Sequence, residues 1–122
     1  MKACLKVLVI DDEDSVLSLV GGFLRDMGHE YEYASSGEAA QRLSKEALST
    51  FDVAVVDWNM PGMNGFETAE YLRHLNPNLL YIMLTAHGTP AKITESFRLN
   101  FVGYLEKEIE FDAFKKGIPN GW

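Results

Sequence analysis

Five polar residues stand at the ends of short apolar runs, where they could do chemistry together. Asp11 and Asp12 follow the first run, Asp57 ends the third, Thr85 follows the fourth and Lys107 follows the fifth. If the first and third runs are neighbouring parallel strands, about 4.8 Å apart, Asp12 and Asp57 repel each other. At roughly 4 Å and an effective dielectric constant of about 20, this repulsion costs on the order of 4 kcal/mol. Mg²⁺ would relieve it, because this ion binds one or two carboxylates and leaves room for phosphate oxygens.

Thr85 and Lys107 add groups that a metal site alone does not need. A hydroxyl donor and an ammonium opposite a carboxylate suit an anion with several acceptor oxygens, and a phosphoryl group fits that description. If Asp57 is a nucleophile that forms an acyl phosphate, Mg²⁺ and Lys107 neutralise charge on the phosphoryl group while Thr85 donates to one of its oxygens. The residue types therefore predict phosphoryl chemistry at Asp57.

Short apolar runs and segments of helical period alternate along the chain, and these elements must position the five residues. Strands are predicted at residues 5–10, 51–56, 79–84 and 101–105, and an edge strand at Glu30–Ala34, where polar and aromatic residues alternate. A first helix is predicted through Val16, Val20 and Leu24, with Asp14 as its N-cap and Gly28 at its end. Further helices are predicted at residues 36–48, 65–75, 90–100 and 111–118.

A strand followed by a helix, five times over, predicts a doubly wound α/β fold with a parallel sheet and right-handed crossovers. The carboxyl ends of parallel strands meet at one edge of the sheet, and ligands of open α/β sheets bind there. The five polar residues are therefore expected to converge. Periodicity leaves the order of the strands open.

The composition limits the class of protein. With 122 residues, 47% of them hydrophobic, the chain suits one domain with its own core. A net charge of -7 argues against nucleic-acid binding by this chain alone, because such binding needs clustered Lys and Arg. The single Cys4 fits a reducing compartment, and the N-terminal apolar run is too short for a signal peptide or a membrane span. We therefore expect a cytoplasmic protein that makes no membrane contact.

The ordered set of motifs resembles a response-regulator receiver domain of two-component signalling, of the chemotaxis-regulator type. The resemblance rests on VLVIDD at residues 7–12, DWNMPGMNG at 57–65, LTA at 84–86 and GYLEK at 103–107. It implies the flavodoxin-like receiver fold, with strand order 2-1-3-4-5. The receiver domain would cover residues 1–118, and residues 119–122 would be a short tail or the start of a linker.

The resemblance also implies a role for each residue of the acidic group. Asp57 corresponds to the phosphate acceptor, and Asp12 corresponds to the principal Mg²⁺ carboxylate. Asp11 would act mainly through water. The backbone carbonyl of Asn59 would complete the metal ligands from the protein.

Thr85 and Lys107 match the residues that bind the phosphoryl oxygens in this family. Tyr104 matches the aromatic residue that turns inward when the threonine is drawn to the phosphate, so Thr85 and Tyr104 would form the switch. The implied phosphoryl donor is a sensor histidine kinase or a phosphotransfer protein. A downstream protein or output domain would bind the face formed by residues 90–118. Such a switch catalyses only its own phosphorylation and dephosphorylation and turns over no external substrate.

One position departs from the family pattern, because Glu108 stands where a proline usually follows the lysine through a cis bond. A cis bond before a non-proline residue costs roughly 2.5–4 kcal/mol. The bond between Lys107 and Glu108 is therefore either trans in a rebuilt loop or cis under strain. Glu106, Glu108 and Glu110 also surround Lys107 with negative charge, which competes with phosphate for its ammonium.

Two other functions stay open at this point. The missing proline after Lys107 favours a receiver-like module that binds its partner without phosphorylation. A Mg²⁺-dependent phosphohydrolase also uses an aspartyl nucleophile, but it normally has an acid two residues further on, where this chain has Asn59. Simpler interpretations are a helix cap for Asp11 and Asp12, a solvated surface charge for Lys107, and an ordinary surface position for His29.

Overall fold

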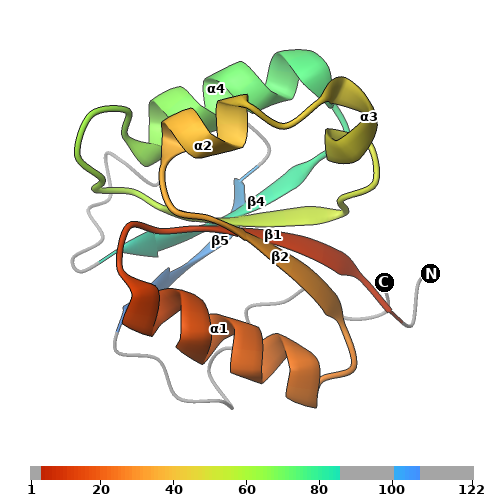
Figure 1. The fold of residues 1–122 in the computed structure, drawn as a ribbon, viewed down its shortest axis with the longest axis vertical. Helices are drawn as coiled ribbons and strands as arrows, with labels where there is room; N and C mark the ends of the chain where they lie inside the picture. The colour runs from red at the N-terminus through yellow and green to blue at the C-terminus, as the bar shows by residue number, and fades with distance from the viewer. Residues whose placement is uncertain (1–3, 86–100, 108–122) are drawn as a thin grey trace.

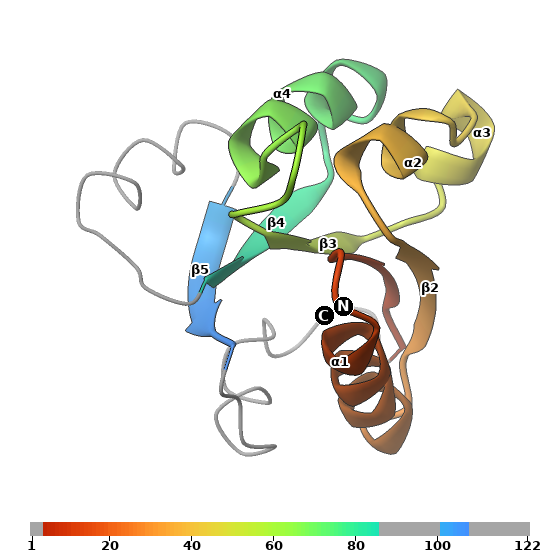
Figure 2. The same ribbon diagram turned by 60° about the vertical axis from the view of Figure 1, so that its left-hand side comes forward.

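Five parallel strands form one sheet in the computed structural model, which describes residues 4–85 and 101–107. The strands are β1 (Lys6–Ile10), β2 (Glu30–Ala34), β3 (Val53–Asp57), β4 (Leu80–Thr85) and β5 (Phe101–Glu106). Their order across the sheet is β2-β1-β3-β4-β5 (Figures 1 and 2). This order confirms the one implied by the resemblance, and β2 lies at an edge as its alternating sequence predicts.

Helices cover both faces of the sheet (Figure 1). The described helices are α1 (Asp14–Asp26), α2 (Gly37–Gln41), α3 (Lys45–Leu48) and α4 (Gly65–Leu75). α1 lies on one face, whereas α2, α3 and α4 lie on the other. The prediction of a doubly wound fold is therefore confirmed. Within the described part of the chain, no helix has the length and apolar character needed to cross a bilayer.

Each face of the sheet has its own apolar core, because successive side chains of a strand point to opposite faces. In β1, Val7 and Val9 pack into the core under α1, whereas Leu8 and Ile10 pack into the core under α2 and α4. Every residue of β3 is buried, because this strand lies between β1 and β4 and is covered on both faces. The apolar runs in the sequence therefore mark central strands.

The start of α1 differs from the prediction, because its N-cap is Glu13 and Asp14 is already the first helical residue. The Glu13 side chain makes no capping hydrogen bond. Instead, Asp11 Oδ1 accepts a hydrogen bond from the backbone N–H of Glu13 at 2.8 Å. The prediction of Asp14 as the N-cap was wrong, because the buried carboxylate of Asp11 already orders the turn that enters the helix.

The prediction of one continuous helix at residues 36–48 was also wrong, because the structure has two short helices there, α2 and α3. Ser36 is the N-cap of α2, as its position predicts, and its side chain accepts from the N–H of Ala39. Ser44 then caps α3 by accepting from the N–H of Ala47 at 3.1 Å. A serine that bonds the backbone two or three residues further on favours a new helix start over continuation of the old helix.

Some predictions fall on residues that the structure does not describe. These are the helices at residues 90–100 and 111–118, the tail at 119–122 and the geometry of the bond between Lys107 and Glu108.

Candidate functional site

The carboxyl ends of β1, β3, β4 and β5 bring four of the predicted site residues to one edge of the sheet. Asp11 follows β1, Asp57 and Thr85 are the last residues of β3 and β4, and Lys107 follows β5. β1 pairs directly with β3, so Asp11 and Asp57 become neighbours. The backbone N–H of Lys107 donates to the carbonyl oxygen of Thr85 at 2.9 Å, which places the lysine beside the end of β4.

Asp57 is a fully buried carboxylate that an ammonium and a backbone amide contact. Its Oδ2 lies 3.0 Å from Lys107 Nζ, and its Oδ1 accepts from the N–H of Asn59 at 3.1 Å. Burial raises the pKa of Asp57 to about 6, and the charge of Asp11 adds to this effect while Lys107 and the Asn59 amide oppose it. A buried carboxylate with a perturbed pKa at a strand end is typical of a functional site.

Asp11 is buried as completely as Asp57, but one of its oxygens has no hydrogen-bond partner in the part of the chain that the structure describes. Oδ1 accepts from the N–H of Glu13, whereas Oδ2 has no hydrogen bond among the described residues and lies 3.5 Å from Lys107 Nζ. Burial raises the pKa of Asp11, against the lowering effects of the Glu13 amide and Lys107. A buried, unsatisfied carboxylate oxygen is costly, so it indicates a ligand position.

The carboxylates of Asp11, Asp12 and Asp57 form one group, with an oxygen from each lying within 4.8 Å of the others. Asp12 is exposed, whereas the other two are buried. An all-oxygen donor set with one solvent-facing member suits a hard cation such as Mg²⁺, which keeps several waters. The unsatisfied oxygen of Asp11 is an independent sign that the group fits a metal ion. Asn59 is exposed, and the structure places it beside this group through its amide contact with Asp57.

Lys107 is not a solvated surface charge. Only 17% of its side chain is exposed, and its ammonium contacts Asp57, Asp11 and the carboxylate of Glu13, the last at 2.9 Å. Burial lowers the pKa of Lys107, but the hydrogen bonds to Glu13 and Asp57 outweigh it and the net shift is upward. Lys107 is therefore a fixed positive charge beside Asp57 at any physiological pH.

Glu13 is the member of this site that sequence reasoning missed. The acidic residues expected to crowd Lys107 were Glu106, Glu108 and Glu110, whose side chains lie outside what the structure describes. The contact comes instead from a residue 94 positions earlier in the chain. The available signal was the third acid in the run Asp11-Asp12-Glu13, which follows the first strand directly.

Gly65 brings the loop after β3 back against its own strand end. Its N–H donates to the carbonyl of Trp58 at 3.0 Å. A Cβ at Gly65 would lie only 2.6 Å from the carbonyl oxygen of Asp57, so the close approach requires glycine. Trp58 is buried and packs edge-on against Phe66 of α4 and Phe101 of β5. The backbone that follows Asp57 is therefore held in place by the packing of Trp58 against α4 and β5.

The two predicted switch residues differ in their burial. Thr85 is 1% exposed at the end of β4, whereas Tyr104 of β5 is 47% exposed. Tyr104 pairs with Met83 in the β4–β5 ladder, two residues before Thr85 on that strand. The two residues therefore lie on adjacent strands, two positions apart along the ladder, with Thr85 buried and Tyr104 exposed.

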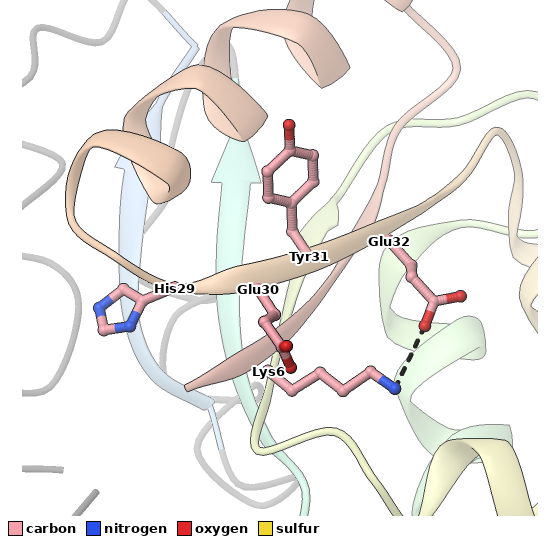
Figure 3. Close-up of a pocket in the computed structure, with 5 residues that line it drawn as sticks. All are labelled: Lys6, His29, Glu30, Tyr31 and Glu32. Carbon is pink, nitrogen blue, oxygen red and sulfur yellow. Dashed lines mark ion pairs between the residues drawn. The ribbon is translucent and has the colours of Figure 1, made fainter. Parts of the chain in front are cut away.

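A hollow of about 410 Å³ lies at the opposite end of the sheet from this site and is lined by Lys6, His29, Glu30, Tyr31 and Glu32 (Figure 3). Lys6 pairs with Glu32 at 3.3 Å, and the His29 ring points away from this pair. His29 Nδ1 accepts a hydrogen bond from the backbone N–H of Leu5 at 3.0 Å. His29 therefore has a structural contact, and its prediction as an ordinary surface residue was wrong.

Comparison with known proteins identifies the family. The sequence model of one protein family, the response regulator receiver domain, matches residues 7–118. The chain belongs to this family. The receiver domain is 32% identical over 117 residues to chemotaxis protein CheY-3 of Vibrio cholerae, a match that covers 93% of this chain and 88% of that protein. The crystallised chemotaxis protein CheY4 of Vibrio cholerae is 34% identical with a TM-score of 0.84, over 93% of this chain and 95% of that one.

Longer regulators also match the receiver domain. Transcriptional regulatory protein ZraR of Escherichia coli (strain K12) is 29% identical over 106 residues, which are 87% of this chain and 24% of that protein. The chain therefore spans about a quarter of the length of the curated transcriptional regulators that it matches.

Proposed function

We propose that this receiver domain is a phosphoryl-accepting signalling switch in which Asp57 is the acceptor. The donor is the phosphohistidine of a sensor histidine kinase or of a phosphotransfer protein. A carboxylate oxygen of Asp57 bonds to phosphorus, the phosphorus–nitrogen bond breaks, and its electron pair stays on the leaving imidazole nitrogen. The product is an acyl phosphate on Asp57.

The ion pair between Lys107 and the buried Asp57 is the observation that most strongly supports this proposal. The ammonium is 3.0 Å from Asp57 Oδ2. From nearly this position it can donate to the oxygens of a phosphoryl group on Asp57 and stabilise their negative charge. The backbone N–H of Asn59 donates to the other carboxylate oxygen, so the orientation of the Asp57 carboxylate is fixed. Mg²⁺, held by Asp11, Asp12 and Asp57 with the carbonyl of Asn59, would supply the positive charge that offsets the incoming phosphoryl oxygens.

We further propose that Thr85 donates to a phosphoryl oxygen and that Tyr104 turns inward in response. The phosphoryl group adds about -1.5 to -2 charges, which favours an arrangement that brings the Thr85 hydroxyl to it. The half-exposed position of Tyr104 leaves room for such a movement. A downstream protein or output domain would then bind the face of residues 90–118.

The chemistry at Asn59 favours this switch over a phosphohydrolase. A phosphohydrolase needs a second acid near its aspartyl nucleophile to protonate the leaving group, and Asn59 offers an amide at that position.

We propose that residues 1–118 form the receiver domain, that residues 119–122 are a tail or the start of a linker, and that the protein works in the cytoplasm.

Labelling with a small phosphoryl donor tests the proposal. The protein is incubated with acetyl phosphate and Mg²⁺, and intact mass spectrometry counts the phosphoryl groups before and after hydroxylamine, which cleaves acyl phosphates. We expect one labile group on the parent protein and on Asp52→Asn, which alters an aspartate at the other end of β3, and none on Asp57→Asn. Equal labelling of Asp57→Asn and the parent protein would refute the assignment. An unlabelled parent protein would favour a binding module that works without phosphorylation.

A further inference from the structure

Glu13 contacts the ammonium that the proposed phosphoryl site needs. It stands at the N-cap of α1, and its Oε1 lies 2.9 Å from Lys107 Nζ. This distance matches the 3.0 Å between the same nitrogen and Asp57 Oδ2. Lys107 therefore divides its charge between the proposed acceptor and a residue that takes no part in the proposed transfer.

Lys107 donates two hydrogen bonds to carboxylates, and its ammonium also lies beside a third. An ammonium has three N–H groups, and Asp57 and Glu13 each accept one, while Asp11 Oδ2 lies 3.5 Å away. A phosphoryl group on Asp57 adds oxygens that need a donor. These oxygens then compete with the existing carboxylates for the ammonium.

Glu13 is the carboxylate that can leave. Asp57 and Asp11 are fully buried, and their short side chains are fixed by backbone amides. The side chain of Glu13 is 54% exposed, and within residues 4–85 and 101–107 its carboxylate has one hydrogen bond, the one to Lys107. On leaving, the carboxylate of Glu13 can be hydrated at once, so its release costs little compared with moving a buried charge.

We propose that Glu13 is a positioning residue that competes with the phosphoryl group for Lys107 and so weakens phosphorylation of this receiver domain. The proposal rests on the proposed function of Asp57. Two effects act in the same direction: the Glu13 contact occupies a donor of Lys107, and its negative charge repels the incoming anion. Glu13 thus sets how strongly the domain holds its phosphoryl group.

Beryllium fluoride with Mg²⁺, a stable mimic of an aspartyl phosphate, gives the affinity directly by calorimetry. We expect Glu13→Gln, which keeps the size of the side chain and removes its charge, to bind about two- to fivefold more tightly than the parent protein, the range of an exposed ion pair. Asp14→Asn is the matched control, because it removes a charge from the next residue, whose carboxylate has no ion pair with Lys107 among the described contacts. Its affinity should equal that of the parent protein.

Salt separates competition from a general structural effect. The advantage of Glu13→Gln should shrink as KCl rises, because a half-exposed ion pair is screened while a packing change is not. An affinity of Glu13→Gln equal to or weaker than that of the parent protein would overturn the proposal, as would an equal gain in Asp14→Asn or a gain that salt does not change. If acetyl phosphate does not label Asp57 of the parent protein, the proposed function fails and this inference fails with it. If labelling succeeds and the affinities do not differ, only the role of Glu13 fails.

Discussion

Replacing Asp57 with asparagine should stabilise the metal-free fold. The carboxylate is fully buried, it faces Asp11, and burial raises its pKa from 3.8 to about 6. The folded state therefore binds a proton at Asp57 more tightly than the unfolded state does. For an acid whose pKa is raised on folding, stability falls as the pH increases from the unfolded to the folded pKa. The loss is nearly complete at pH 7, about one unit above the folded pKa.

The size of the effect follows from the two pKa values. At about 1.4 kcal/mol for each pKa unit, the rise from 3.8 to about 6 corresponds to about 3 kcal/mol at pH 7. An asparagine at this position carries no charge, so it escapes this cost. Its amide does not reproduce both the contact to Lys107 and the contact to Asn59, each worth on the order of 1 kcal/mol. We therefore expect Asp57→Asn to raise the free energy of unfolding by about 1–3 kcal/mol at pH 7.

Urea unfolding followed by circular dichroism, with a chelator present, measures this difference. The gain should be largest at pH 7 and should fall below about 1 kcal/mol at pH 4, where the folded parent protein has a neutral Asp57. Asp26→Asn is the control, because it removes an exposed carboxylate at the end of α1 and should change stability by less than about 0.5 kcal/mol. Mg²⁺ should stabilise the parent protein more than Asp57→Asn.

A lower stability of Asp57→Asn at pH 7, with Asp26→Asn unchanged, would refute the reasoning. That result would mean that Lys107 compensates the buried carboxylate fully, so that no cation is needed to offset it.

Two further predictions concern stability away from the site. Gly22→Ala, with open space around its position in α1, should stabilise the fold by about 0.5–1 kcal/mol in urea unfolding. Gly21→Ala should be less stable than Gly22→Ala by about 1 kcal/mol or more, because its Cβ would lie 2.9 Å from the Tyr31 ring as well as meeting the Tyr33 hydroxyl. Equal effects of the two substitutions would contradict this. Burial lowers the pKa of His29, so the neutral ring that accepts from Leu5 N–H stabilises the fold above pH 6.5 and this contribution is lost as the pH falls. In an Asp57→Asn background, His29→Ala should flatten the rise in stability between pH 5 and 7, and an unchanged slope would count against this contact.

The convergence of Asp11, Asp57 and Lys107 was predictable because each of them ends or follows an apolar run. Parallel strands bring their carboxyl ends to one edge, so residue positions along the chain were enough to place these side chains together. The strand order had a different source. Periodicity does not distinguish the possible orders of five strands, and only the resemblance to a family supplied the one that the structure confirms.

The errors arose where polar side chains decide local structure. Ser44 starts a new helix in a segment whose apolar spacing would fit one longer helix, and Asp11 orders the turn at which Asp14 was expected to act as cap. The contact of Glu13 with Lys107 depends on an exposed side chain reaching a residue 94 positions away. Such contacts follow from the packed fold and leave little trace in spacing or hydrophobic pattern.

The location and metal dependence of the phosphoryl group test the central claim most directly. After incubation with acetyl phosphate, tandem mass spectrometry of peptides from the parent protein should find the phosphoryl group on Asp57 when Mg²⁺ is present, and little label when a chelator replaces it. Label on another residue, or equal label with and without Mg²⁺, would contradict the account of a metal-assisted aspartyl switch at the carboxyl edge of the sheet.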